Sequence, residues 1–210
     1  MNSTSFASIM VLAAFLSFVL APRVSLNAAE IHADTAVQPD DRDRQVLQAA
    51  LLHVLADPKF NLTRSTNANA VFLNVRNPDK TGMLRPGQMA QDIGEGRTIP
   101  SFIQTNLLSR NQKPGSTYDS VPVSFAELKF DPKIVVADIS SESKKWPFAK
   151  AHPSARGWFE AWLPGYSEDG KQAVVRSWVG PSPHGAMATI FLEKEQGGWV
   201  VKWHHIAHFA

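Results

Sequence analysis

The last quarter of the chain, residues 156–209, most constrains the fold, because it reads as a meander of four strands joined by turns. Glycine-containing turns at 167–171 and 195–198 are typical of hairpins, since glycine adopts the positive φ that such turns need. A proline-rich loop at 180–185 separates the middle strands. The stretches between these breaks are rich in Val, Ile, Trp and Phe, which favour strands. They are 157–163, 172–179, 186–193 and 199–206.

Alternation of side chains along these strands assigns residues to the two faces of the predicted sheet. In the first strand, Trp158, Glu160 and Trp162 share one face. In the last strand, strict alternation places Trp199 and Trp203 together on one face. Both faces of the sheet carry apolar groups. We therefore expect one face to pack on a helix and the other to be partly covered by the preceding segment.

An amphipathic helix is predicted ahead of these strands. Asp40 or Asp41 can cap its first turn, and Asp57-Pro58 ends it, because proline disfavours a helical residue before it. Apolar residues recur at helical spacing at Val46, Leu47, Ala50, Leu51, Val54 and Leu55. The sequence therefore predicts an α+β fold, with one main N-terminal helix packed on a twisted, mainly antiparallel sheet of five or six strands. Cystatin-like cones share this arrangement and often enclose a pocket between helix and sheet.

Strand-like and irregular stretches alternate between the predicted helix and the meander. Residues 70–75 and 134–139 are predicted strands, and 101–110 is a predicted short helix. Residues 76–97 are rich in Gly, Pro and Asp and show no sustained period, so we expect a loop there. No repeat or low-complexity segment divides residues 41–210, which are expected to form a single globular domain.

The N-terminus is typical of a secretory signal. Residues 9–21 form an apolar run too short to span a membrane, and small residues at 27–29 suit cleavage. We expect a signal peptide over residues 1–29, a flexible lead-in over 30–40, and no stable membrane span after cleavage. The alternative is an uncut anchor, because no Lys or Arg precedes the apolar run. The expected location is secreted or periplasmic.

Composition limits the partners and cofactors. With 21 basic and 19 acidic residues, the chain lacks the charge excess expected for binding nucleic acid or an anionic membrane surface. It has no cysteine, which excludes disulfides and thiolate metal sites and suits a bacterial envelope. The sequence contains no phosphate loop and no dinucleotide fingerprint, so we expect no cofactor.

Five short patterns follow one another along the chain. They are Asn-Leu-Leu-Ser-Arg-Asn at 106–111, an aromatic-rich stretch at 146–153, Gly-Trp at 157–158, Tyr-Ser-Glu-Asp-Gly-Lys-Gln-Ala at 166–173, and Leu-Glu-Lys ahead of Gly-Trp-Val-Val at 192–201. Together they resemble a loose group of secreted bacterial proteins of unknown function, which end in an antiparallel β-meander with a Leu-x-Lys…Gly-Trp-x-Val hairpin. Members often carry cysteines in the loop that corresponds to 180–185, where this chain has none. The resemblance implies an architecture and no activity.

One candidate binding site is the face that carries Trp158, Glu160 and Trp162. Indoles can stack on a sugar ring while the carboxylate accepts hydroxyl hydrogen bonds, and a carboxyl between indoles can also serve as a general acid. The alternative is structural, with the indoles in the core and Glu160 paired to Arg176 or Lys202 on a neighbouring strand. Glycoside hydrolysis needs a second acid, which the sequence does not nominate.

A second candidate is a metal site near the C-terminus. His204 and His208 are four residues apart and share one face of a strand or a helix. A pair of neutral imidazoles with a carboxylate can hold zinc or iron. In an extended strand, residues four apart are about 13 Å distant, too far to share an ion unless the chain bends. Surface or edge-capping histidines are the alternative.

These observations favour an exported, non-catalytic binding or interaction module of the cell envelope. Its partner would be an unidentified small molecule, a glycan or a protein. The alternative is an envelope hydrolase that uses Glu160 or the histidine metal site. An apolar pocket or an exposed aromatic patch would favour the binding module, and a bound metal or a closed pocket with two carboxyls would favour the hydrolase.

Overall fold

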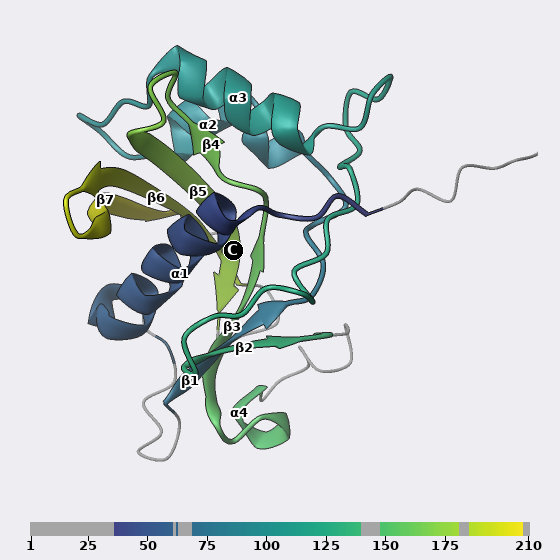
Figure 1. Ribbon diagram of the computed structural model, residues 1–210, viewed down its shortest axis with the longest axis vertical. Coiled ribbons are helices and arrows are strands. Elements are labelled where there is room, and N and C mark those ends of the chain that lie inside the picture. Colours follow the sequence, from purple (N-terminus) through teal and green to yellow (C-terminus); the bar gives the residue numbers. More distant parts are fainter. Residues whose placement is uncertain (1–35, 61, 63–68, 140–147, 181–184, 208–210) are drawn as a thin grey trace, which may run out of the picture. The chain divides into compact units, whose positions relative to one another are not determined.

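The computed structural model describes residues 36–60, 62, 69–139, 148–180 and 185–207 (Figure 1). The chain divides into a unit of residues Met1–Ala33 and a unit of residues Asp34–Ala210. The predicted signal peptide lies outside the described residues, and every element below belongs to the second unit. No helix among the described residues is both long enough and apolar enough to cross a membrane.

Helix α1 spans Asp41–Ala56 and begins with a capping box. The Asp40 side chain accepts the N–H of Asp43 at 2.8 Å, and the Asp43 side chain accepts the N–H of Asp40 at 3.1 Å. Asp57 is the C-cap, and the 3₁₀ turn η1 (Pro58–Phe60) follows. The apolar stripe of the helix is buried, as its spacing requires. It consists of Val46, Leu47, Ala50, Leu51, Val54 and Leu55.

Within the described residues, seven strands form one sheet in the order β2-β1-β3-β5-β6-β7, with β4 paired to β5. The strands are β1 (Ala70–Asn74), β2 (Ile134–Ala137), β3 (Ala155–Ala161), β4 (Gly165–Tyr166), β5 (Gln172–Gly180), β6 (Ala186–Glu195) and β7 (Gly198–Ala207). β1 runs parallel to β2 and β3, and the other pairs are antiparallel. The fold is therefore α+β with a mostly antiparallel open sheet. The strand beyond the predicted five or six is β4, whose two residues are too few to show alternation.

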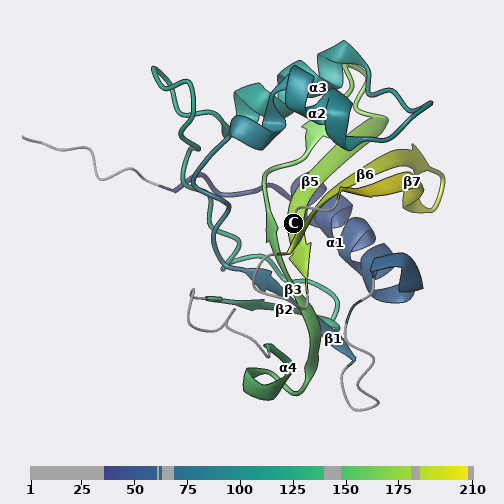
Figure 2. The same cartoon turned by 180° about the vertical axis from the view of Figure 1, so that it is seen from behind.

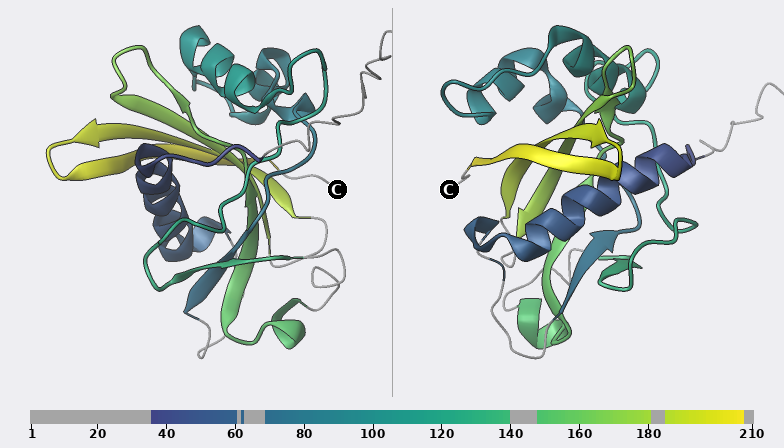
Figure 3. Two further views of the ribbon diagram at one scale, coloured as in Figure 1. Left: turned by 45° about the vertical axis from the view of Figure 1, so that its right-hand side comes forward. Right: turned by 60° about the vertical axis from the view of Figure 1, so that its left-hand side comes forward.

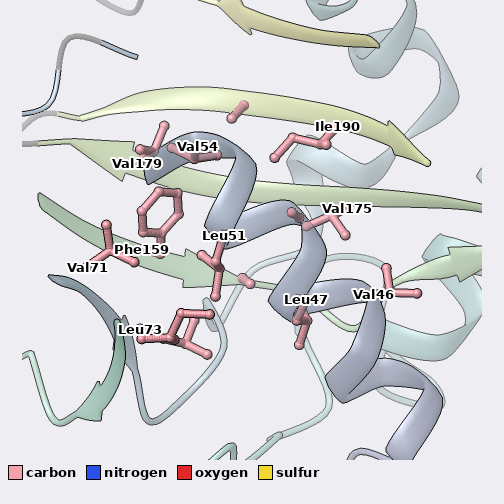
Figure 4. Packing of buried hydrophobic residues seen from close by; sticks show 14 of the residues in the cluster. Val46, Leu47, Leu51, Val54, Val71, Leu73, Phe159, Val175, Val179 and Ile190 are labelled. Atoms are coloured by element: carbon pink, nitrogen blue, oxygen red, sulfur yellow. The ribbon is translucent and has the colours of Figure 1, made fainter. Parts of the chain in front are cut away.

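The sheet face beneath α1 is a continuous apolar core (Figures 3 and 4). Helix α1 packs against β1, β2, β5, β6 and β7. This core includes Leu51 and Val54 of α1 together with Phe159, Val175 and Val179 of the sheet. These sheet residues occupy alternate positions of β3 and β5, so the period of two directs them to the same side.

The opposite face of the sheet carries two clusters of buried hydrophobic residues, whose helices lie far apart in Figures 1 and 2. The helices on this side are α2 (Pro86–Asp92), α3 (Ser101–Asn111) and α4 (Phe148–Ala151). The α2–α3 cluster contains Phe191 of β6 and Trp162, which follows the end of β3. The α4 cluster contains Trp158 and Ile139. Trp178 packs against both clusters and therefore marks where they meet.

Helix α2 and the 3₁₀ turn η2 (Gly82–Leu84) form where a loop was predicted. Pro86 occupies the first turn of α2, where its missing N–H has no intrahelical partner to lose. Seven residues are too few for a helix to be stable by local propensity. Burial of Leu84 and Met89 in the α2–α3 cluster stabilises the segment instead, and such tertiary packing leaves no periodic signal in the sequence.

The last strand departs from strict alternation. The β6–β7 register pairs Phe191 with Trp203 and Leu192 with Val201, so Lys202 is an extra residue in β7. Trp199 consequently packs in the α1 core, whereas Trp203 packs with the α2–α3 cluster. The prediction that both indoles share one face was wrong, because a shift of one residue moves every later side chain to the other face.

Candidate ligand-binding site

A cavity of about 810 Å³ lies on the sheet face opposite α1. Its volume falls within the range that proteins use for small organic ligands. The cavity is lined by Asn74, Arg76, Asn77, Pro78, Asp79, Lys80, Gly82, Met83, Arg85, Gln88, Tyr118, Glu160, Trp162 and Trp178. The sheet therefore supplies one wall, and the segment from β1 to α2 supplies most of the others.

Glu160 and Trp178 form the sheet wall of the cavity. The two residues are directly opposite each other in the β3–β5 register, so the carboxylate and the indole are neighbours on one face. Asn74, at the end of β1, donates its Nδ2 to Oε1 of Glu160 at 2.9 Å. The Oδ1 of Asn74 accepts the backbone N–H of Ile139 at 3.1 Å. Because its amide is engaged at both ends, Asn74 fixes the position of one carboxylate oxygen.

The segment that forms the outer wall is held by hydrogen bonds to the chain around it. Asn77 donates to the carbonyl of Val121 at 3.0 Å and accepts the N–H of Val123 at 2.9 Å. Lys80 forms an ion pair with Asp119 at 2.7 Å, and this hydrogen bond raises the pKa of Lys80. These contacts tie the wall to the segment around residues 119–123, which favours a preformed cavity.

Arg176 of β5 fastens η2 and α2 to the sheet beside the cavity. Its guanidinium pairs with Asp92 at 2.7 Å and donates to the carbonyl of Met83 at 2.8 Å and to Oγ1 of Thr189 at 2.6 Å. Burial lowers the pKa of Arg176, and the hydrogen bond to Asp92 opposes that change. The guanidinium stays charged at neutral pH because arginine is too strong a base to lose its proton there. Arg176 therefore positions the Met83 wall of the cavity.

The outer part of the cavity is polar and mostly cationic. Arg85 stacks over the ring of Tyr118 at 4.2 Å and donates to the carbonyl of Thr117 at 2.6 Å. Arg76 and Lys80 are exposed at the same side, and Asp79 adds a carboxylate. The cavity thus combines aromatic surface, amide groups and charges of both signs, which suits a small ligand with several hydroxyl, amino or carboxyl groups.

The structure separates the three residues proposed from the sequence as a ligand site. Glu160 and Trp162 both line the cavity. Trp162 is 1% exposed, and its Nε1 donates to the carbonyl of Lys80 at 3.2 Å, so the indole is part of the wall. Trp158 lies in the α4 cluster and is not among the residues that line the cavity.

Trp178 and Asn74 line the cavity but were not identified from the sequence. Alternation alone puts Trp178 on the face of Glu160 once the β3–β5 register is known, whereas Asn74 reaches that face through a parallel β1–β3 pair. The proposed structural partners of Glu160 make other ion pairs. Arg176 pairs with Asp92, and Lys202 pairs with Glu195 at 2.6 Å.

His204 belongs to a second polar cluster, on the α1 side. His53 Nε2 lies 3.0 Å from His204 Nδ1, and each imidazole has a nitrogen 3.7 Å from Oδ2 of Asp57. Partial burial lowers the pKa of both His53 and His204, while Asp57 acts in the opposite direction. The extra residue at Lys202 brings His204 to this face. His208, its predicted partner, lies outside the described residues.

Comparison of the chain with models of protein families, with curated proteins and with solved structures gave no significant match. The resemblance to secreted bacterial proteins therefore stays an expectation.

Proposed function

We propose that this protein is an exported, non-catalytic binding domain that takes a small hydroxylated ligand, such as a saccharide, in the cavity beside Glu160. One observation carries the proposal. A carboxylate and an indole, Glu160 and Trp178, lie next to each other on the wall of a cavity of about 810 Å³. Sugar rings present an apolar face to an indole and hydroxyl groups to a carboxylate, so the pair matches both parts of such a ligand.

The surroundings of Glu160 support recognition by a fixed carboxylate. Asn74 holds Oε1 at 2.9 Å, which reduces the conformational freedom that would be lost when a ligand binds. The cationic groups at the outer side, Arg76 and Arg85, would add hydrogen bonds to a ligand with carboxyl or phosphoryl substituents. Acidic saccharides fit this combination better than neutral ones.

Export is proposed from the N-terminal apolar run at residues 9–21 and the small residues after it. A secreted or periplasmic location would expose the cavity to envelope glycans. The cone that the sequence suggested would place a ligand between helix and sheet. The proposal does not depend on that cone, because the cavity lies on the sheet face opposite α1.

The test is a titration of the purified chain with a panel of neutral and acidic mono- and oligosaccharides, followed by tryptophan fluorescence and calorimetry. Glu160→Gln keeps the shape of the side chain and removes its charge, so affinity is expected to fall by about 10-fold or more, as for loss of a charged hydrogen bond. Trp178→Ala is expected to weaken binding by a similar factor, because it removes the stacking surface.

Glu193→Gln is the matched control, because Glu193 is a carboxylate of the same sheet that does not line the cavity. This variant should bind as the unaltered chain does. If no saccharide binds, or if Glu160→Gln and Glu193→Gln bind equally well, the proposed ligand class is wrong.

A hydrolase is the second candidate, and one observation favours it. Asp79 lines the same cavity as Glu160, which gives the two carboxyl groups that glycoside hydrolysis requires. Under this hypothesis, Glu160→Gln and Asp79→Asn would each remove turnover of a saccharide that still binds. Turnover that persists in both variants, or binding without any turnover, would exclude the hydrolase.

A further inference from the structure

The polar cluster between α1 and β7 consists of His53, Asp57 and His204. Each residue offers one ligand-type atom, and these atoms all lie within 4.8 Å of one another. Two imidazoles and a carboxylate are a donor set that zinc and other first-row transition metals prefer. The cluster is on the opposite side of the sheet from the saccharide cavity, so it has no part in the proposed function.

Local structure brings these three side chains together and orients them toward one another. His53 and Asp57 are four residues apart at the end of α1, so they lie on the same side of the helix. The Oδ1 of Asp57 accepts the backbone N–H of Lys59 at 2.9 Å, while Oδ2 is the oxygen closest to both imidazoles. His204 comes from β7, where the extra residue Lys202 places it on the α1 side. The carboxylate is therefore oriented by a hydrogen bond of its own, as metal-binding carboxylates usually are.

The distances leave room for an ion after a small adjustment. Two nitrogens bound to one tetrahedral zinc are about 3.4 Å apart when each bond is about 2.1 Å long. His53 Nε2 lies 3.0 Å from His204 Nδ1 and 3.7 Å from Asp57 Oδ2, whereas the 3.7 Å contact between His204 and Oδ2 is made by its other nitrogen, Nε2. His204 would bind an ion through one of its two nitrogens, and the three ligand atoms already lie within 4.8 Å of one another, so the ion would replace the contact between the rings with two metal–nitrogen bonds.

The cluster is both supported and accessible. The Phe60 ring lies against His204 with centroids 4.7 Å apart and the ring planes tilted by 35°, which restrains the imidazole from one side. The side chains of His53, Asp57 and His204 retain 30%, 20% and 13% of their exposure, so an ion can enter from solvent. His53 also lies in the last turn of α1, where the helix dipole favours positive charge.

From this geometry we infer that His53, Asp57 and His204 form a binding site for a divalent transition-metal ion, with Zn²⁺ the best match. The three ligands leave at least one coordination position for water or an anion. His204 also lines a cavity of about 480 Å³ whose other residues include Lys59, Arg97 and Lys202. The positive charges of these side chains repel a metal ion bound nearby. They therefore favour an anion as the ligand that completes its coordination.

The test uses the untagged full chain, stripped of metal with a chelator and titrated with ZnCl₂ in a calorimeter. One ion per chain is expected. His53→Ala and His204→Ala should each weaken Zn²⁺ binding by more than about 10-fold, since even substitutions outside the ligand sphere cost 10–100-fold. Asp57→Asn, which keeps the shape and the hydrogen bond to Lys59, should weaken binding in the same direction. Co²⁺ should give a visible absorption band that is lost in the same variants.

His205→Ala is the matched control, because His205 is the next residue of β7 and its Nδ1 lies 3.1 Å from Arg97. It should bind Zn²⁺ as the unaltered chain does. Thermal unfolding without metal identifies any variant that has lost its fold, and His53→Gln then replaces His53→Ala. The inference is overturned if the chain binds no Zn²⁺, if binding survives His53→Ala and His204→Ala in folded protein, or if His205→Ala or His208→Ala abolishes it instead.

Discussion

The two faces of the sheet bury different kinds of side chain. Beneath α1, the core is filled by aliphatic and aromatic side chains such as Leu47, Phe159 and Val175, which are 0–2% exposed. On the opposite face, Arg176 is also 0% exposed, its partner Asp92 is buried beside it, and the face carries a cavity of about 810 Å³. One face is a single close-packed apolar core, whereas the other combines two smaller apolar clusters with buried polar contacts around a cavity.

The difference shows where stability and recognition reside in this molecule. A close-packed apolar face gains free energy from every methylene it buries, and it loses free energy when a gap is opened. Buried polar contacts add little to the net free energy of unfolding, because each buried charge must first be desolvated. Such contacts do hold a cavity in one shape, and a cavity with fixed polar groups is what ligand binding requires.

We expect the largest difference in the free energy of unfolding when one aromatic residue on each face is replaced by alanine. Phe159→Ala opens a gap in the α1 core and should reduce the free energy of unfolding by about 3–5 kcal/mol. Trp178→Ala, on a half-buried residue that lines the cavity, should cost less than half as much, although it removes a larger ring. Denaturant unfolding followed by circular dichroism measures both. Equal costs would mean that the cavity wall is a core in its own right.

Breaking the buried ion pair should have the next largest effect. Asp92→Ala leaves the Arg176 guanidinium buried without its carboxylate, and the free energy of unfolding should fall by about 3 kcal/mol. Replacing both members, with Arg176→Met and Asp92→Leu, should recover most of that loss, because no unpaired charge remains. A double variant that is less stable than Asp92→Ala would show that the pair itself holds the opposite face together.

A smaller effect is expected at the polar contact that borders the α1 core. Asp43 forms a bidentate pair with Arg110 at 2.8 and 2.9 Å and accepts the Tyr166 hydroxyl at 2.8 Å. Asp43→Asn keeps the hydrogen bond from Tyr166 and removes the charge. We expect a loss of about 1–2 kcal/mol, because Arg110 is partly accessible to solvent. Thermal unfolding would contradict this expectation if the midpoint did not move.

The smallest effect on stability is expected at Glu160. Glu160→Gln preserves an oxygen that can accept the hydrogen bond from Asn74, so the free energy of unfolding should change by less than about 0.5 kcal/mol. The same variant is expected to lose the proposed ligand, which separates recognition from stability. A loss above about 1 kcal/mol would assign Glu160 to the structural frame rather than to binding.

Features that depend on local spacing could be predicted from the sequence. The Asp40 cap, the apolar stripe of α1 and the stop at Asp57-Pro58 can be read from residues within a few positions of one another. Alternation likewise assigned Phe159 and Glu160 to opposite faces of β3. These signals are sufficient to predict an α+β fold with apolar residues on both faces of the sheet.

Features that join distant parts of the chain could not be predicted, because they depend on how the whole domain packs. The extra residue at Lys202 exists because β7 pairs with β6, and it moves Trp203 away from Trp199 and brings His204 within 3.0 Å of His53, 151 residues earlier. Arg176 meets Asp92 across 84 residues in the same way. Strand register and side-chain partners at such separations are set by packing of the whole domain, and no local period records them.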